Sequence, residues 1–247
     1  YAMKRLIEGY GHQASFCDFR NGQPRHEGIK APGESKFDKI RKIPSILASP
    51  GRYLEKRSFR TQLRECFEHQ AWPLLGFDVS PDYDTDCDLM VIGSDEVFNY
   101  TQNQTFGYVP ELFGHNLNAR TIIAYAASAG YASLRDVEND GMNDELRRGF
   151  GNFARIGVRD KNTYDMVSAL SPRPPDLVID PTLVYDFSPD LQPTSRAPGY
   201  LLVYAYEGRL DSPEEVRVIR SLAASKGLRI LSIGSYHEWC DENIVAA

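Results

Sequence analysis

Small and charged residues follow four apolar segments of this chain, in positions where they could bind an anion. The residues concerned are Gly93, Ser94, Asp95, Ser128, Arg159 and Asp180. Glycine and serine let a backbone approach a ligand closely, and a planar guanidinium can bind a phosphate or a carboxylate through two parallel hydrogen bonds. These residue types therefore favour a ligand that carries phosphate or carboxylate groups.

Each of these positions also has a purely structural interpretation. Arg159 could form a salt bridge with Asp160 or Asp180 instead of binding a ligand, and Asp180, which precedes a proline, is expected to be structural or to orient Arg159. The turn at residues 93–95 could bind an anion, helped by the N-terminus of a following helix, or be an ordinary turn. Ser128 could line the same crevice or allow tight packing of a strand against a helix.

Several common site motifs are absent from the sequence. The five histidines have no metal-binding spacing, and no Gly-x-Gly-x-x-Gly or Gly-x-Ser-x-Gly occurs after a predicted strand. The alternating acids at 82–88 lack the glycine and glutamate of a calcium loop, because Cys87 and Gly93 stand at those positions. We therefore expect no metal site and no dinucleotide cofactor.

The elements that carry the candidate residues alternate between strands and helices. Apolar runs predict strands at 14–19, 88–92, 121–127, 155–159 and 177–179. Helices are predicted at 2–10 and 161–170, the second capped by Asp160. Strands that are apolar throughout are typical of a parallel sheet covered on both faces. The fold class is therefore α/β, with a doubly wound, Rossmann-like sheet.

Composition divides the chain into two α/β domains. Residues 1–187 form the first, and 188–199, which hold three prolines, form a linker. Residues 200–247 contain one βαβ unit, with strands at 200–206 and 228–233 around a helix at 212–226. We expect a second domain that is incomplete, and a chain truncated at both ends.

Charge is concentrated in one segment. The chain has a net charge of −6, which argues against nucleic-acid binding, yet residues 36–64 hold nine basic residues and two acidic ones. The segment 36–69 is predicted to be a surface helical arm with a solvated basic face; the alternative is peripheral contact with an anionic membrane.

No signal peptide or membrane-spanning run is evident, and four scattered cysteines predict a cytoplasmic protein, at most peripheral at the inner face of the membrane.

Four stretches, in this order, resemble the polysaccharide pyruvyl transferase family. They are Asp88-Leu-Met-Val-Ile-Gly-Ser-Asp-Glu-Val-Phe-Asn99, Ile122-Ile-Ala-Tyr-Ala-Ala-Ser-Ala-Gly130, Ile156-Gly-Val-Arg-Asp160 and Val178-Ile-Asp-Pro-Thr-Leu-Val184. The resemblance implies two facing α/β domains, as in GT-B glycosyltransferases. It also implies transfer of the enolpyruvyl group of phosphoenolpyruvate onto two hydroxyls of a sugar, which forms a pyruvate ketal in cell-surface polysaccharide synthesis.

The same resemblance implies roles for the candidate residues. Arg159 would bind phosphoenolpyruvate, and Gly93, Ser94, Asp95, Ser128 and Asp180 would line the cleft, with Asp95 close to an acceptor hydroxyl. Phosphoenolpyruvate is a substrate, so no cofactor is expected, and the sugar acceptor could be lipid-linked. The family's Phe-His-Gly motif, which supplies a candidate catalytic acid, does not occur in this sequence. The catalytic residue is therefore unknown, and we expect this stretch of chain to be inactive alone.

Two other functions remain open from the sequence. One is a GT-B glycosyltransferase that uses a nucleotide sugar, and the other is a non-catalytic glycan-binding protein of the same fold. Protection of the protein by a nucleoside diphosphate instead of phosphoenolpyruvate would indicate the glycosyltransferase. Glycan binding that is independent of phosphoenolpyruvate would indicate the binding protein.

Overall fold

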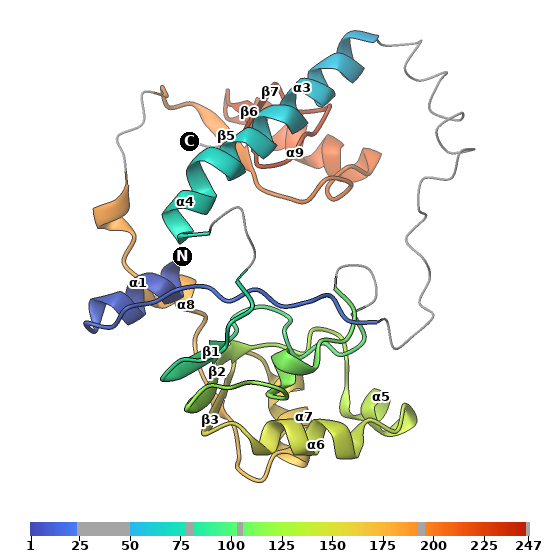
Figure 1. The fold of residues 1–247 in the computed structure, drawn as a ribbon. Coiled ribbons are helices and arrows are strands. Elements are labelled where there is room, and N and C mark those ends of the chain that lie inside the picture. Colours follow the sequence, from blue (N-terminus) through green and yellow to red (C-terminus); the bar gives the residue numbers. More distant parts are fainter. Residues whose placement is uncertain (24–49, 78–81, 103–105, 192–195, 246–247) are drawn as a thin grey trace. The chain divides into compact units, whose positions relative to one another are not determined.

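The computed structural model describes residues 1–23, 50–77, 82–102, 106–191 and 196–245 (Figure 1). Its contacts divide the chain into two compact units. Unit 1 consists of Tyr1–Gly33 and Asp78–Phe187, and unit 2 consists of Glu34–Phe77 and Ser188–Ala247. Within the described residues, no helix is both long and apolar enough to cross a bilayer.

Unit 1 is built on a parallel four-stranded sheet in the order β1-β2-β3-β4. The strands are β1 (Leu89–Ile92), β2 (Thr121–Ala127), β3 (Arg155–Val158) and β4 (Asp176–Leu177). Met90 pairs with Ile122, and Ala124 pairs with Ile156, so the apolar runs of the sequence lie side by side. The predicted α/β class with a parallel sheet is confirmed. The described strands follow one another in chain order, and the reversal that makes a sheet doubly wound remains a prediction.

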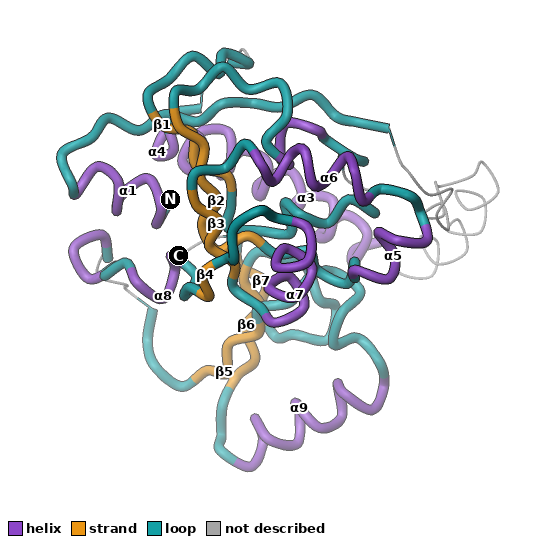
Figure 2. Tube along the Cα trace, turned by 90° about the horizontal axis from the view of Figure 1, so that it is seen from below, coloured by secondary structure: helices purple, strands orange, loops and turns teal. Residues whose placement is uncertain are grey.

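Helices lie on two sides of these strands. Figure 2 shows α5 (Leu134–Asn139), α6 (Asn143–Gly151) and α7 (Lys161–Leu170) on one side of the strands, and α1 (Ala2–Gly9) and α8 (Pro181–Val184) on the other. A short 3-10 helix, η2 (Pro110–Phe113), lies in the connection between β1 and β2. The predicted helix at 161–170 forms with Asp160 as its cap, because the Asp160 carboxylate accepts a hydrogen bond from the Thr163 N–H.

The core of unit 1 is rich in aromatic rings that the connecting segments provide. Phe98 is fully buried, and its ring centroid lies 5.0 Å from that of Phe150, 5.6 Å from that of Phe113 and 5.9 Å from that of Phe153. Buried aromatic pairs in such tilted and edge-on arrangements stabilise a core beyond their buried area. The connections after β1 and β2 are therefore fixed to the sheet, and with them the residues at the strand ends.

One predicted strand of unit 1 does not form. Residues 14–19 are extended but belong to no sheet, and the only ladder contact described near them is an isolated bridge between Gln23 and Tyr108. An alternating pattern becomes a strand only when a neighbouring strand exchanges hydrogen bonds with it. Among the described residues, the backbone bond of this segment is a single one, from the Asp18 N–H to the Asp82 carbonyl.

Unit 2 contains a second parallel sheet in the order β5-β6-β7. Its strands are β5 (Tyr200–Val203), β6 (Arg229–Ile233) and β7 (Glu242–Ile244), and α9 (Pro213–Ser225) connects the first two. The predicted βαβ unit is thus confirmed. Ser212 and Glu215 form a capping box at the start of α9. The short η3 (Ser188–Asp190) precedes the sheet, and residues 192–195 of the predicted linker lie outside the described residues.

The basic segment also belongs to unit 2. It contains α3 (Pro50–Cys66), a π-helical turn η1 (Phe67–Ala71) and α4 (Trp72–Leu75), while residues 36–49 lie outside the described residues. The sequence pattern predicts that the arm at 36–69 belongs to the first domain, but the contacts group Glu34–Phe77 with Ser188–Ala247. The reason is a set of contacts between residues far apart in the sequence: the ring of the buried Phe59 lies 5.8 Å from the Tyr236 ring, and Lys56 and Arg60 pair with Glu207.

Candidate active site

The candidate residues of unit 1 gather at the carboxyl edge of its sheet. The parallel strands bring their carboxyl ends to this edge, where open α/β sheets bind their ligands. Backbone hydrogen bonds hold the ends together. The Ser128 N–H donates to the Asp95 carbonyl over 3.0 Å, and the Arg159 N–H donates to the Ala127 carbonyl over 3.2 Å.

Arg159 lies at the centre of this edge. Its Nη1 donates to the Ser94 carbonyl over 2.5 Å and to Asp180 Oδ2 over 2.9 Å. Its Nη2 lies 3.6 Å from Asp95 Oδ1, too far for a hydrogen bond, and 31% of the side chain is exposed. The structure thus brings together Arg159, Ser94, Asp95 and Asp180. One side of the guanidinium is held by protein groups, and among the described residues Nη2 has the exposed Asp95 carboxylate as its nearest charged neighbour.

Asp180 orients Arg159 and also caps a helical turn. Its Oδ1 accepts hydrogen bonds from the Thr182 N–H over 3.0 Å and from the Thr182 hydroxyl over 2.7 Å, at the start of α8. Burial of the carboxyl opposes ionisation, but the hydrogen bonds from Thr182 and Arg159 outweigh it and hold the pKa of Asp180 below its ordinary value. Asp180 is therefore a carboxylate at neutral pH.

Asp95 differs from Asp180 in its exposure. Its side chain is 90% exposed, and its Oδ1 accepts a hydrogen bond from the Glu96 N–H over 2.8 Å. Arg159 thus faces two carboxylates, one fixed and one exposed, and the three groups together carry a charge of −1. An exposed carboxylate can accept a hydrogen bond from a sugar hydroxyl, or move away from the guanidinium when an anion binds.

The turn after β1 requires glycine. Gly93 has a φ of +136°, and a Cβ at this position would lie 2.1 Å from the Tyr125 carbonyl oxygen of the neighbouring strand. The prediction that a helix begins directly after this turn is wrong, because residues 93–101 form turns and bends. Local side-chain bonds, such as those from the Thr101 N–H and hydroxyl to Asn99 Oδ1, compete with helix formation in this segment.

Ser128 supports the edge from inside. It is 5% exposed, and its Oγ accepts a hydrogen bond from the Gly130 N–H over 3.0 Å. Its carbonyl accepts the Phe98 N–H over 2.9 Å. The Ser128 hydroxyl is therefore engaged within the turn that follows β2.

One family comparison covers nearly the whole chain. The model of the family described as polysaccharide pyruvyl transferase matches residues 1–243. The chain belongs to this family. Neither the comparison with curated proteins nor the comparison with solved structures finds a match. Membership makes the protein a transferase and connects its acceptor with polysaccharide.

The candidate site also contains the Glu96 carboxylate, which the sequence interpretation did not select as a site residue. Glu96 Oε2 accepts hydrogen bonds from Asn99 Nδ2 over 3.0 Å and from Gln102 Nε2 over 3.3 Å. It lies against Gly130, where an added Cβ would come within 2.5 Å of the same oxygen. The i, i+3 and i+6 spacing of these polar residues was the available signal, but the contact with Gly130 depends on the turn after β2.

His237 of the transferase is a structural residue of unit 2. It is 1% exposed; its Nδ1 lies 2.9 Å from Asp211 Oδ1, and its Nε2 lies 3.3 Å from the Ala205 carbonyl. Trp239 Nε1 donates to the same Asp211 oxygen over 2.7 Å. Both ring nitrogens are occupied within the protein, which agrees with leaving this histidine out of the catalytic assignment.

No cluster that could hold a metal ion occurs in the part of the chain that the structure describes. The chemistry that the edge itself offers is a partly held guanidinium, one fixed carboxylate and one exposed carboxylate. Such a set can bind a small oxyanion at Nη2 and accept a hydrogen bond from a hydroxyl beside it.

Proposed function

We propose that this family member transfers the pyruvyl group of phosphoenolpyruvate to a polysaccharide precursor, with Arg159 as a ligand of the donor. The observation that supports this most directly is the state of Arg159: Nη1 is held by Asp180 and the Ser94 carbonyl, and Nη2 is 3.6 Å from the exposed Asp95. A guanidinium fixed on one side loses little freedom when its other side binds a carboxylate or phosphate.

The reaction in this proposal forms two C–O bonds and breaks one. Two hydroxyl oxygens of a sugar bond to the central carbon of phosphoenolpyruvate, the bond from that carbon to the phosphate oxygen breaks, and phosphate leaves. The two hydroxyl groups each lose a proton. One proton is matched by the proton that the methylene carbon gains when it becomes a methyl group, and the other leaves with phosphate. Asp95 is the expected partner of an acceptor hydroxyl. The acceptor in this proposal is a sugar, carried on a lipid or on a nucleotide.

Charge sets a further requirement. Because Arg159, Asp95 and Asp180 together carry −1, phosphoenolpyruvate needs cations in addition to Arg159. We expect them from elsewhere in the protein, and we expect the Asp95 carboxylate to move away from Nη2 when the donor binds.

Thermal unfolding with and without phosphoenolpyruvate tests this function. A ligand at about 100 times its dissociation constant stabilises the folded state by ~2.7 kcal/mol. We expect phosphoenolpyruvate to raise the unfolding temperature of the wild type, and Arg159→Lys to remove most of the shift, because lysine lacks the paired donors of arginine.

Arg155→Lys is the matched control, because Arg155 lies at the other end of β3 and its side chain is 79% exposed. It should leave the shift unchanged. An equal shift in wild type and Arg159→Lys would remove Arg159 as the ligand. A shift with a nucleoside diphosphate in place of phosphoenolpyruvate would indicate a glycosyltransferase, and glycan binding independent of both would indicate a binding protein.

A further inference from the structure

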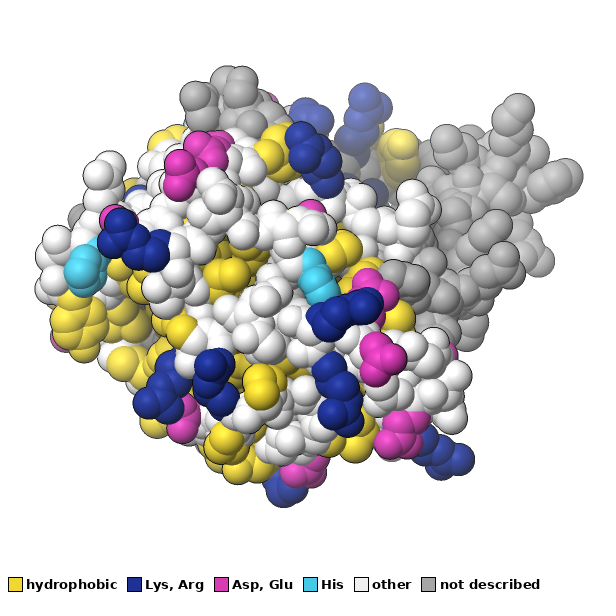
Figure 3. Space-filling model, turned by 60° about the horizontal axis from the view of Figure 1, so that its bottom comes forward, with side chains coloured by type: hydrophobic (Ala, Val, Ile, Leu, Met, Phe, Trp, Pro, Cys, Tyr) yellow, Lys and Arg dark blue, Asp and Glu magenta, His cyan; other side chains and the backbone are white. Residues whose placement is uncertain are grey.

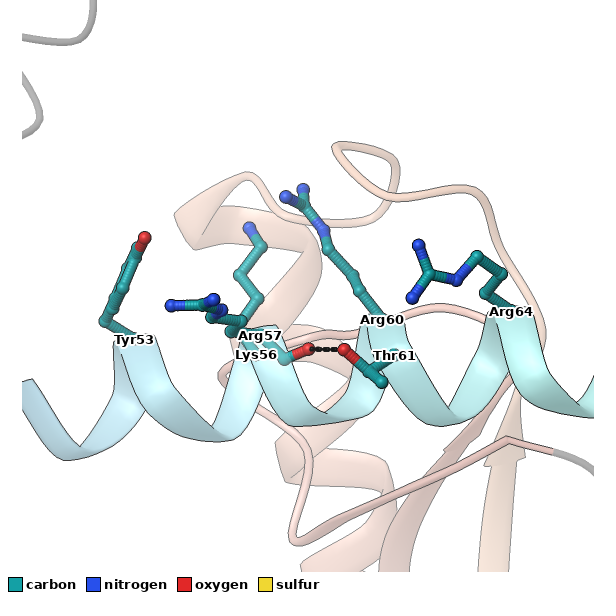
Figure 4. Close-up of a pocket in the computed structure, with 6 residues that line it drawn as sticks. All are labelled: Tyr53, Lys56, Arg57, Arg60, Thr61 and Arg64. Carbon is teal, nitrogen blue, oxygen red and sulfur yellow. Dashed lines mark hydrogen bonds between the residues drawn. The ribbon is translucent and has the colours of Figure 1, made fainter.

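Four basic side chains form a continuous stripe along α3. We call Lys56, Arg57, Arg60 and Arg64 the basic stripe. Together with Tyr53 and Thr61 they line a shallow pocket of about 290 Å³ on unit 2 (Figure 4). Tyr53, Arg57, Arg60 and Arg64 recur at the three- and four-residue spacing that places side chains on one face of a helix. Arg57 and Arg64 are two turns apart, which is about 10 Å along the axis.

A different side of α3 holds the helix to its unit. Phe59, 6% exposed, is the buried aromatic residue of this helix and contacts the Tyr236 ring. Successive residues are about 100° apart around a helix, so Phe59 lies more than 90° around the axis from the middle of the basic stripe. The stripe is therefore on a side of α3 that does not pack on Tyr236.

Nearby acids neutralise only part of the stripe. Glu207 binds Lys56 Nζ over 2.6 Å and Arg60 Nη2 over 2.9 Å, and Glu68 lies 4.0 Å from Arg64 Nε. Arg57 has no ion pair with any residue that the structure describes, and it is exposed. Glu65 lines a second pocket together with Arg57. Four cations against the three carboxylates of Glu207, Glu68 and Glu65 leave a charge of +1. On the face drawn in Figure 3, by contrast, basic and acidic side chains are interspersed.

Exposed apolar side chains accompany the stripe. In α3, η1 and α4, large apolar residues remain between 42% and 66% exposed: Tyr53, Leu54, Phe67, Trp72 and Leu74. Tyrosine and tryptophan are enriched where a protein meets the headgroup layer of a membrane, because one end of the ring is apolar and the other is polar. A soluble phosphate ligand would use the cations but not these side chains.

We propose that the basic stripe binds the phosphate groups of anionic lipids and holds the protein at a membrane surface. Several cations spread over about 10 Å fit a row of headgroups better than one small ion. The exposed Tyr53 and Trp72 would enter the headgroup layer beside them. This binding does not depend on pyruvyl transfer, so the two proposals can fail separately.

Vesicle sedimentation tests the proposal. We expect the wild type to bind vesicles of phosphatidylcholine mixed with phosphatidylglycerol, and to bind pure phosphatidylcholine much more weakly. Raising salt from about 0.1 M to about 1 M shortens the screening length from ~10 to ~3 Å and should release the protein. Arg57→Glu with Arg64→Glu should lower the apparent affinity for anionic vesicles by more than about tenfold.

Two further variants control for folding and for total charge. Arg217→Glu with Lys226→Glu makes the same charge change on exposed residues at α9, where Arg217 lies 4.0 Å from Glu214 as Arg64 does from Glu68. This pair should reduce binding much less than the α3 pair. Arg57→Gln with Arg64→Gln keeps the helix without like-charge clashes and should give an intermediate loss.

Three results would overturn the proposal. They are equal binding to neutral and anionic vesicles, equal losses from the α3 and α9 variants, and binding of inorganic pyrophosphate at the stripe without binding to vesicles. The last result would assign the stripe to a soluble diphosphate instead of a lipid surface.

Discussion

The Nη1 of Arg159 and the Oδ2 of Asp180 lie 2.9 Å apart and join the ends of two neighbouring strands of the unit 1 sheet. Asp180 at the same time caps the short helix α8 through Thr182. The pair therefore couples the orientation of the guanidinium to the segment that follows β4. The charge of Asp180 should therefore affect the free energy of unfolding of the protein.

Asp180→Asn should destabilise the protein by about 1–3 kcal/mol at pH 7, because it weakens a charged hydrogen bond and a helix cap. The pKa of Asp180 is lower in the folded state than in the unfolded state. Its contribution is thus present above the unfolded pKa of about 3.9 and is lost as the pH falls through the folded value. Urea unfolding at several pH values should show the difference from wild type shrinking in acid.

Asp176→Asn is the control for Asp180. Asp176 lies at the start of β4, its side chain is 63% exposed, and it is 3.8 Å from Arg155, whose side chain is 79% exposed. Exposed ion pairs contribute little, so this substitution should change stability by less than about 1 kcal/mol. Similar losses at the two positions would contradict a special role for Asp180.

Gly93→Ala should destabilise unit 1 by several kcal/mol or prevent folding, because its Cβ would overlap the Tyr125 carbonyl and its φ is positive. Gly151→Ala at the end of α6 meets no atom within 4 Å and should be neutral or stabilising by up to about 1 kcal/mol. Chemical unfolding of both variants measures this. A Gly93→Ala protein as stable as wild type would show that the turn after β1 tolerates a side chain.

Local sequence patterns account for most of the sheet. The strands 121–127 and 155–159 are apolar runs with turn residues at their ends, and α7 has a cap at Asp160, so each could be predicted within a residue. β7 could not, because Glu242–Ile244 is a three-residue strand with no apolar run and depends on pairing with β6. The segment 14–19 is the converse case, an apolar pattern without a partner strand.

The candidate site, like the sheet, could be predicted only in part from the sequence. Arg159 and Asp180 could be placed at one edge because parallel strands bring their carboxyl ends together. The position of Glu96 against Gly130 depends on a turn conformation, and the association of α3 with unit 2 depends on Phe59 meeting Tyr236. Contacts between distant parts of the chain have no local signal in one sequence.

His237→Leu should lower stability by about 1–3 kcal/mol, because it removes one hydrogen-bond partner of Asp211 and the histidine partner of the Ala205 carbonyl. If His237 is structural, phosphoenolpyruvate should still raise the unfolding temperature of the variant as much as that of wild type. Loss of that shift, in a variant that is otherwise folded by circular dichroism, would instead connect His237 with the donor.

Asp95→Asn should change donor binding and catalysis in opposite directions. Removing the carboxylate 3.6 Å from Arg159 takes away a repulsive charge, so phosphoenolpyruvate should bind more tightly. If Asp95 accepts the acceptor's hydroxyl proton, the rate of transfer should fall by about 10²–10⁴. Calorimetry for the donor, and phosphate release by the full-length protein with acceptor present, measure the two effects. Asp88→Asn is the matched control, since Asp88 is 89% exposed and also 3.6 Å from an arginine, Arg120, but at the other end of β1. It should change neither quantity.

Weaker donor binding in Asp95→Asn would mean that Asp95 helps to hold the donor, and an unchanged rate would remove it from the reaction.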